Sequence, residues 1–368
     1  MVEAIPTPTR GRLRSLDALR LLAALGVVVF HYTNRQNAAW GGPIAETFPE
    51  LATVTVFGAF GVQLFFMISG FVVLMSAWGR TVPEFVASRV SRLYPAYWVG
   101  VLATGLYLYL DRAAPGVANW DKIGIVGWLT NFTMVQPAVG VPNVDGVYWT
   151  LWAELKFYLL LGIFIAIGIT RNRILLVCAA WPVAAMLAAI SKERLLTEIL
   201  QPDNAPFFAM GMILFLIWRE GPSFITVILL LANLSFALRL GFTSLWWTTN
   251  GGPSHPWKVV ALFIIFVLLI LLATHGPLAR LDWKWLSAAG ALTYPLYVLH
   301  AELGWGLIGA IQAYLPPYVT LAIVIGVMLV AAWLVNRFVE RPLGPIIRRA
   351  VLRSITVMPG TRAPEVKE

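Results

Sequence analysis

The segment "LDALRLLAALGVVVFHY", residues 16–32, holds Arg20 and His31 with ten residues between them that are all apolar or glycine. Eleven helical steps of about 100° return to within about 20° of the starting direction, so both side chains lie on one helix face. Imidazole titrates near pH 6.5, which makes His31 a candidate general base. Exposing either side chain to lipid costs about 2.5 to 3.5 kcal/mol, which favours a bundle interior. Alternatively, Arg20 extends to the cytoplasmic surface or pairs with Asp17, and His31 reaches the interface.

Two further basic residues, Arg89 and Arg92, lie three apart in "EFVASRVSRLYPAYW". Helical spacing places both guanidinium groups on one face, where they can bind phosphate through paired hydrogen bonds. The alternative is that they anchor a helix end at the cytoplasmic surface. The spacing therefore indicates a phosphate site or a topology signal.

Other polar residues interrupt later apolar segments. Glu154, in "YWTLWAELKFYLLL", lies at a membrane depth similar to that of His31, so we expect its carboxylate to orient the imidazole. Pairing with Lys156 does not explain Glu154, because residues two apart on a helix do not face each other. His300, in "ALTYPLYVLHAELGW", is either a second functional histidine or a structural one. Ser69, in "GVQLFFMISGF", is explained by close helix packing.

Apolar stretches that must position these residues recur along all 368 residues, of which 59% are hydrophobic and 12% charged. Soluble domains average about 25% charged residues, so the composition predicts an all-α polytopic membrane protein. A short apolar segment within residues 111–147 predicts an additional interfacial or re-entrant helix. The ten predicted transmembrane spans fall near residues 16–34, 52–78, 95–110, 148–169, 174–190, 205–219, 222–240, 257–274, 290–312 and 318–338.

Arginine and lysine gather in alternate loops, which by the positive-inside rule places both termini in the cytoplasm. This distribution explains the net charge of +9 without a nucleic-acid partner. Cys178 is the only cysteine and lies in an apolar run, which disfavours a thiol nucleophile, and no zinc-type ligand spacing predicts a metal. We expect a cytoplasmic tail over residues 1–15, a membrane domain over 16–342 and a basic cytoplasmic tail over 343–368, disordered at its end.

In this order, the segments resemble the acyltransferase 3 family of multi-spanning membrane O-acyltransferases over residues 16–342. The most specific shared element is the first-span pair of Arg20 and His31, with ten residues between them. Each pattern is weak alone, and their common order makes the resemblance specific. The others are F-x3-R-x2-R-L-Y-P-x-Y at 85–97, W-T-L-x2-E-x2-F-Y at 149–158, T-Y-x2-Y-x2-H at 293–300 and E-R-P at 340–342.

The resemblance implies transfer of an acetyl or other short acyl group from acyl-CoA to a hydroxyl, at the plasma membrane. The implied acceptor is a carbohydrate, an envelope glycan or glycolipid, or a glycosylated metabolite. His31 would act as the base and Glu154 as its partner, while Arg89 and Arg92 would hold the CoA phosphates. Some members carry an extracytoplasmic hydrolase-like domain after the last span, and we expect none here.

Several roles stay open within that resemblance. His300 and Ser69 are supporting candidates, because direct transfer is expected but an acyl intermediate on Ser69 or on the first-span histidine is an alternative. Arg20 would bind donor phosphate, pair with Asp17, or do both. Two rival functions also fit the polar residues: a proton-coupled carrier or flippase for a polar or acylated solute, and a structural or assembly protein that binds no donor.

Overall fold

The computed structural model describes residues 13–116, 118–249, 256–281 and 283–356, and all regular elements in these ranges are helices. Eight helical stretches among the described residues are long and apolar enough to cross a membrane. Two shorter apolar helices, at Phe224–Arg239 and Ala301–Ile311, lie in the regions of the two remaining predicted spans. The predicted all-α polytopic fold is confirmed.

The helices are named in chain order. The long ones are α1 (Arg14–Thr33), α4 (Gly61–Ala77), α5 (Val82–Leu110), α7 (Trp149–Ile167), α8 (Arg171–Ile190), α10 (Ala205–Glu220), α11 (Phe224–Thr249), α12 (Pro256–Thr274), α13 (Lys284–Leu299), α15 (Pro317–Val335) and α16 (Arg341–Thr356). The short ones are α2 (Ile44–Thr47), α3 (Leu51–Thr55), α6 (Trp120–Asn131), α9 (Arg194–Leu200) and α14 (Ala301–Ile311).

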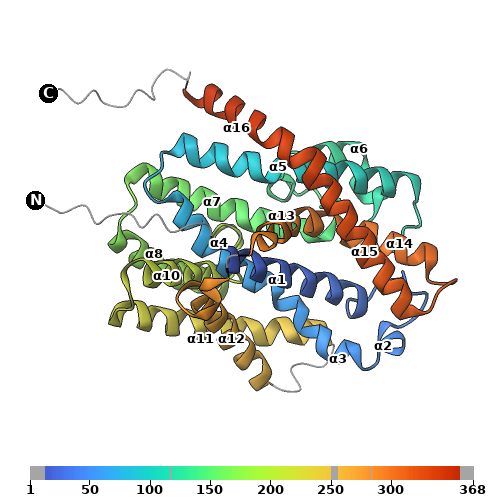
Figure 1. Ribbon diagram of the computed structural model, residues 1–368, viewed down its shortest axis with the longest axis horizontal. Helices are drawn as coiled ribbons and strands as arrows, with labels where there is room; N and C mark the ends of the chain where they lie inside the picture. Colours follow the sequence, from blue (N-terminus) through green and yellow to red (C-terminus); the bar gives the residue numbers. More distant parts are fainter. Residues whose placement is uncertain (1–12, 117, 250–255, 282, 357–368) are drawn as a thin grey trace, which may run out of the picture.

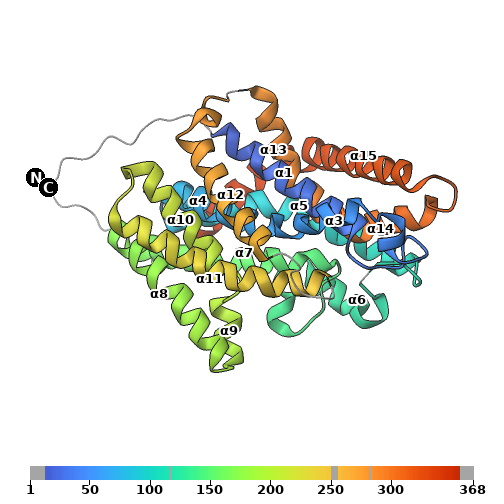
Figure 2. The same cartoon turned by 90° about the horizontal axis from the view of Figure 1, so that it is seen from below.

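Helix α1 lies inside the bundle, in contact with α4, α12 and α13 (Figure 1). Helix α4 packs along α10, and α5 lies between α13 and α16. Figure 2 shows α8 and α9 on the opposite side of the molecule from α15, while α3, α6 and α14 gather at one end of the long helices in both views. Most of the first span is thus buried against other helices, as the ionisable side chains of Asp17, Arg20 and His31 require.

Small residues allow α4 and α10 to approach closely. A Cβ atom added to Gly70 would lie 2.2 Å from the carbonyl oxygen of Phe208, and one added to Gly211 would lie 2.0 Å from that of Met67. Backbone contact of this kind is how membrane helices gain packing energy without a hydrophobic driving force. The contact fixes the part of α4 that carries Ser69.

The start of α5 is set by local sequence. The carboxylate of Glu84 accepts a hydrogen bond of 3.0 Å from the backbone N–H of Thr81, forming part of a capping box, and Pro83 occupies the first turn. The helix therefore begins at Val82 and continues through the span predicted at 95–110, so the predicted start is wrong. This extension makes the segment with Arg89 and Arg92 part of one continuous helix.

Two connections differ from continuous spans. The span predicted at 290–312 is divided at His300 into α13 and α14. The long connection after α5 contains the predicted short helix, α6, which is kinked at Gly124, where φ is +60°. Ile125, Val126 and Leu129 of α6 are exposed. Its first turn also exposes the charged Asp121 and Lys122, so α6 combines charged and apolar exposed side chains, as helices at a membrane interface do.

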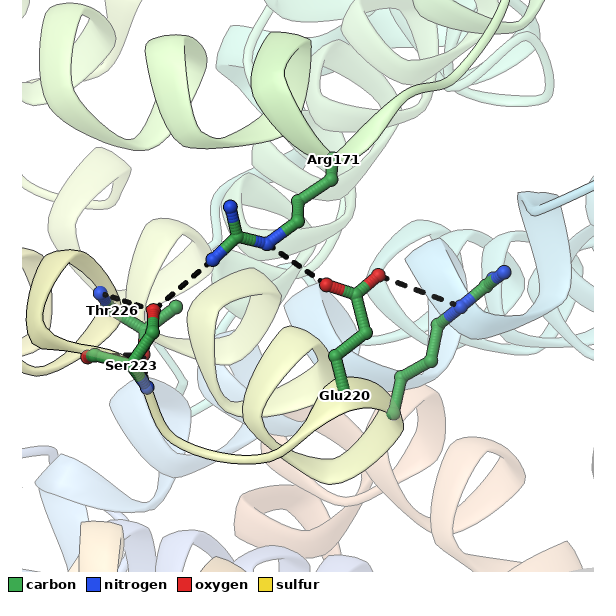
Figure 3. A network of polar contacts seen from close by, with 5 residues as sticks. Arg171, Glu220, Ser223 and Thr226 are labelled. Atoms are coloured by element: carbon green, nitrogen blue, oxygen red, sulfur yellow. Dashed lines mark hydrogen bonds and ion pairs between the residues drawn. The ribbon is translucent and has the colours of Figure 1, made fainter. Parts of the chain in front are cut away.

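Ion pairs join the ends of α8, α10 and α11 that are predicted to face the cytoplasm (Figure 3). Arg171 Nε lies 2.9 Å from Glu220 Oε2, and its Nη2 donates to Ser223 Oγ at 3.1 Å. The guanidinium carbon of Arg219 lies 4.0 Å from the ring centroid of Trp78, at the end of α4. These contacts connect α8 and α10 to the end of α4.

The segment after residue 342 begins as a helix. A π-helical turn at Asn336–Glu340 connects α15 to α16, which packs along α5. Within the turn, Asn336 Nδ2 donates to Glu340 Oε2 at 2.6 Å and its Oδ1 accepts from Arg341 Nε at 3.2 Å. Residues 343–356 of the predicted tail are therefore ordered against the bundle, whereas the predicted disorder at residues 357–368, like the tail over 1–12, lies outside the described residues.

Candidate functional site

Five of the predicted site residues line one cavity, which we call the arginine cavity. It encloses about 690 Å³ of empty space, part of it open to solvent. Helices α1, α4, α5, α7 and α13 contribute to its walls, so the cavity lies at the centre of the bundle. The predicted residues are Arg20, Ser69, Arg89, Arg92 and Glu154, and the other polar lining residues are Thr150, Tyr158, Thr293, Tyr294 and Tyr297.

Helical spacing explains why these side chains converge. Thr150, Glu154 and Tyr158 follow one another at intervals of four on α7, and Phe65 and Ser69 do so on α4. Residues at such intervals share a helix face. Each helix therefore turns one polar strip toward a common space, and the predicted pairing of the two α5 arginines on one face is confirmed.

The cavity carries an excess of positive charge, with three arginines against the single carboxylate of Glu154. That carboxylate accepts a hydrogen bond of 2.5 Å from Ser69 Oγ. The guanidinium of Arg89 lies 5.8 Å from the ring centroid of Phe85 and 5.6 Å from that of Tyr158, which hold it by cation–π contact. An anion is the ligand that this charge favours.

Three buried polar atoms on the cavity wall make no hydrogen bond within the described residues. They are Arg89 Nε, Thr293 Oγ1 and Tyr294 OH. A buried donor without a partner costs about 1 to 3 kcal/mol, so such atoms gather where a ligand completes them. Arg89 and Tyr294 bring a cationic and a hydroxyl donor to the same space. The arginine cavity is therefore built to receive a polar ligand.

Arg20 lies near both of the groups considered for it from the sequence, the expected donor-phosphate site and Asp17. It lines the cavity, and the charges nearest to it include those of Arg92, Glu154 and Asp17. Asp17 is buried beneath it against α13, where a Cβ added to Gly290 would lie 2.5 Å from the Asp17 Cβ. Arg20 is thus placed between a buried carboxylate and the cavity.

The two buried histidines form a pair of their own. His300 Nε2 lies 3.1 Å from His31 Nδ1, and the ring centroids are 5.0 Å apart. Glu154 is not the ring partner, because its described hydrogen bond is to Ser69 and it faces the arginine cavity. The expected contact between Glu154 and His31 is therefore wrong in this structure. Glu154 and His31 were expected to meet because they lie at a similar membrane depth. However, α7 turns Glu154 toward the arginine cavity, and α1 turns His31 toward His300.

Backbone carbonyls assign the tautomers of the neutral pair. His300 Nδ1 lies 2.8 Å from the carbonyl oxygen of Tyr297, and His31 Nδ1 lies 2.9 Å from that of Val27. A carbonyl only accepts, so both Nδ1 atoms carry hydrogen. His300 Nε2 then has a lone pair and accepts from His31 Nδ1. This leaves the lone pair of His31 on Nε2, where it can take a proton.

Surrounding side chains also hold the backbone at both histidines. Trp305 Nε1 donates to the carbonyl oxygen of His31 at 3.0 Å, and Tyr32 OH donates to that of His300 at 2.6 Å. His31 is 7% exposed and His300 is fully buried. The pair is held rigidly at the junction of α1, α13 and α14.

A single aromatic ring joins the histidine pair to the arginine cavity. Tyr297 lines the cavity, and its ring centroid lies 5.6 Å from that of His300. Its hydroxyl accepts a hydrogen bond of 2.8 Å from Thr150 Oγ1. Tyr297 is the second tyrosine of the T-Y-x2-Y-x2-H pattern at 293–300, but the pattern did not indicate its role, although it lies three residues before His300, the spacing that places two side chains on one helix face.

Two buried acidic residues near the histidines, Asp145 and Glu302, were not predicted from the sequence. Asp145 and Glu302 are fully buried, and Asp145 Oδ2 accepts from the backbone N–H of Glu302 at 3.2 Å. Burial and the charge of Glu302 raise the pKa of Asp145 to about 8. Glu302 Oε1 accepts from the N–H of Ala118 at 2.9 Å, so the pair joins three distant segments. Within the described residues no group of three histidine, cysteine or acidic side chains could hold a metal ion.

Comparison with known proteins decides the family. A family model described as "Acyltransferase domain", that of acyltransferase 3, matches residues 13–337. The chain belongs to the acyltransferase 3 family. In this acyltransferase 3 protein, the match covers the helices that build the arginine cavity and the histidine pair. No solved structure matches.

Relatives of this acyltransferase 3 protein carry different names. It is similar to the acyltransferase MdmB of Streptomyces mycarofaciens, at 30% identity over 40% of this chain and 38% of that protein. It is 26% identical to nodulation protein 10 of Rhizobium leguminosarum bv. viciae, over 81% and 86% of the two chains. It is 23% identical to the O-acetyltransferase OatA of Staphylococcus aureus, over 94% of this chain and 59% of that one. The chain thus spans well under two thirds of MdmB and of OatA.

Proposed function

We propose that this protein transfers an acetyl or other short acyl group from acyl-CoA to a hydroxyl of a carbohydrate, an envelope glycan or glycolipid, or a glycosylated metabolite, at the plasma membrane. The observation that carries the proposal is the arginine cavity, which gathers three guanidinium groups and is separated by the Tyr297 ring from His300, the hydrogen-bond partner of the buried His31. Family membership supports acyl transfer, and the name of OatA supports an acetyl group and an oxygen acceptor.

In this proposal, the arginine cavity receives the donor. Arg89 and Arg92 bind CoA phosphates, because a guanidinium offers paired donors to phosphate oxygens and Arg89 Nε has no partner among the described residues. Arg20 adds positive charge deeper in α1, while Asp17 holds it from beneath. Phe65 and Phe66 line the same space and suit the less polar pantetheine arm.

His31 is the proposed general base. Its Nε2 takes the proton of the acceptor hydroxyl as that oxygen attacks the thioester carbonyl carbon. When the tetrahedral intermediate collapses, the carbon–sulfur bond breaks and the CoA sulfur leaves with the proton from Nε2. His300 accepts the Nδ1 hydrogen bond throughout and stabilises the imidazolium, the part usually played by a carboxylate. Neither histidine lines the arginine cavity, and Tyr297 lies between His300 and that cavity, so the proposal requires Tyr297 to move before the acceptor hydroxyl and the donor reach His31 Nε2.

Glu154 has a different role from the one expected. Its 2.5 Å hydrogen bond holds Ser69 and places a negative charge among the arginines. We propose that this carboxylate orients the arginine side chains toward the donor and keeps the Ser69 hydroxyl engaged. Direct transfer then needs no acyl intermediate on the serine.

The donor role of the arginines is tested by kinetics. Replacing Arg89 and Arg92 together with alanine removes the phosphate contacts, so the Michaelis constant for acetyl-CoA should rise at least tenfold, measured by release of free CoA thiol from purified protein. Arg80→Ala is the matched control, because Arg80 is exposed just before α5 and outside the cavity. An unchanged Michaelis constant in the double variant would reduce both residues to membrane anchors. Solute uptake without thiol release would favour a carrier instead.

A further inference from the structure

A second cavity lies on another face of α7 and takes no part in the proposed donor site. We call it the tryptophan cavity, and it encloses about 1180 Å³ of empty space, part of it open to solvent. Its walls come from α4, α7, α9, the start of α10 and the connection before α7. The lining residues that matter here are Gln63, Asn143, Trp149, Trp152, Glu198 and Asp203. About 490 Å³ of this space is wide enough to hold ligand atoms, which lies within the range of about 300 to 1,000 Å³ for small-ligand sites.

The two cavities share helices but not side chains. On α7, Trp149, Trp152 and Lys156 lie at intervals of three and four and face the tryptophan cavity, whereas Thr150 and Glu154 face the arginine cavity. Phe66 of the arginine cavity packs against Trp149, with ring centroids 6.2 Å apart. The tryptophan cavity is therefore a separate compartment beside the donor site. The helix ends around it are those predicted to lie outside the cytoplasm.

Aromatic surface is the first feature of its chemistry. Trp149 lines the cavity and is 45% exposed. Trp152 is fixed, because its Nε1 donates to Glu198 Oε1 at 2.8 Å and the Lys156 ammonium lies 5.3 Å from its ring centroid. A rigid indole offers a flat apolar face with a polar edge. The C–H face of a pyranose ring stacks on such a surface.

Charge and hydrogen bonding exclude the ligand of the other cavity. The lining holds one cation, Lys156, and it is already paired with Glu198 at 2.8 Å, while Asp203 adds a second carboxylate. No cation remains for a phosphate or a nucleotide. Gln63 lines the cavity, and its Oε1 is buried without a hydrogen-bond partner in the described part of the chain. Amide and carboxylate groups bind neutral hydroxyls, which both donate and accept.

From these features we infer that the tryptophan cavity binds an uncharged saccharide, stacked on Trp149 and Trp152 and hydrogen-bonded by the amides and carboxylates around them. This inference rests on the proposed function in one respect, namely that the saccharide is the acceptor. The arginine cavity then receives an anionic donor, and the tryptophan cavity a neutral polyhydroxylated acceptor, on two faces of the same helix. The difference in charge between the two linings favours different ligands for the two cavities.

Equilibrium binding without any donor tests the inference. The probes are uncharged tetrasaccharides of N-acetylglucosamine, of glucose and of mannose, titrated calorimetrically into the full chain in lipid nanodiscs, since glycoside detergents would themselves compete. At least one probe should bind, and Trp152→Ala should weaken it at least tenfold. Trp152→Phe, which keeps a ring for stacking, should retain most of the affinity. Arg89→Ala and Trp283→Ala are matched controls, because these residues lie outside the tryptophan cavity, and both should bind as the unaltered protein does.

Each outcome has one meaning. Absence of binding by all three saccharides, or binding that Trp152→Ala leaves unchanged, overturns the inference. Release of CoA thiol from acetyl-CoA is measured in the same samples. Thiol release without saccharide binding contradicts the tryptophan cavity alone, whereas saccharide binding without acyl transfer contradicts the proposed function and leaves a saccharide-binding membrane protein.

Discussion

At the scale of single residues, the main result is that the hydrogen-bond partner of the His31 ring is another histidine, His300. The carbonyls of Tyr297 and Val27 fix the tautomers of His300 and His31, and His31 Nδ1 then donates to His300 Nε2 at a separation of 3.1 Å. A neutral imidazole stabilises a neighbouring imidazolium less than a carboxylate does, but it places no negative charge in the apolar interior. The positions of both residues were predictable from sequence. Their pairing was not, because it depends on the break between α13 and α14.

Substitution of His300 tests this arrangement. His300→Phe removes the His300 acceptor from His31 Nδ1 and leaves only the Val27 carbonyl, so the turnover number should fall about 100-fold, the lower range for loss of acid–base assistance, with little change in the Michaelis constant for acetyl-CoA. His300→Gln supplies a carbonyl oxygen that can accept the same hydrogen and should retain more activity. His275→Ala, at an exposed helix end, is the control and should be neutral. Equal loss in the Phe and Gln variants would assign His300 to packing alone.

At the scale of helices, the geometry of the arginine cavity depends on close contacts that carry no chemistry. Gly70 lies one residue from Ser69 and touches the backbone of α10. Close packing accounts for Gly70 in "MISGF", whereas the hydroxyl of the neighbouring Ser69, which was explained from the sequence by packing, donates a hydrogen bond to Glu154. One helix turn thus serves packing on one face and the cavity on another.

Alanine substitutions of two helical glycines separate these effects. Gly70→Ala places a Cβ atom 2.2 Å from a backbone oxygen of α10, so overpacking should destabilise the fold by about 1 to 3 kcal/mol. Gly162→Ala, on α7, meets nothing within 4 Å and should be neutral or stabilising by up to about 1 kcal/mol. Thermal unfolding of the purified proteins measures both. A Gly70→Ala protein as stable as the unaltered one would show that α4 and α10 are not tightly packed.

At the scale of the whole molecule, sequence reasoning was reliable for periodic features and weak for contacts between distant segments. Hydropathy predicted the helices, and spacing predicted that Arg89 and Arg92 share a face. Depth alone assigned Glu154 to His31 and was wrong, because depth leaves the rotation of each helix undetermined. Asp145 and Glu302 were missed for a related reason: they lie 157 residues apart and meet only where α7 and α14 begin.

The acidic pair predicts a pH dependence of the whole fold. Asp145 has a folded-state pKa of about 8, above its ordinary value of about 3.9. The unfolded chain therefore loses this proton first as pH rises, and stability should fall between about pH 4 and pH 8. Asp145→Asn removes that ionisation, so its unfolding temperature should depend less on pH, whereas Asp111→Asn, at an exposed site, should follow the unaltered protein. Identical pH profiles for all three proteins would contradict the assignment.

The most direct test of the account is the rate of acetyl transfer by purified His31→Gln protein, because the central claim makes His31 Nε2 the base. Initial rates of CoA thiol release are measured with saturating acetyl-CoA and an acceptor-containing envelope extract, beside the unaltered protein. If His31 Nε2 is the base, the initial rate of the variant should be lower by about 100-fold or more, with the same unfolding temperature and donor affinity. A folded His31→Gln protein that transfers acetyl groups within a few-fold of the normal rate would contradict this assignment.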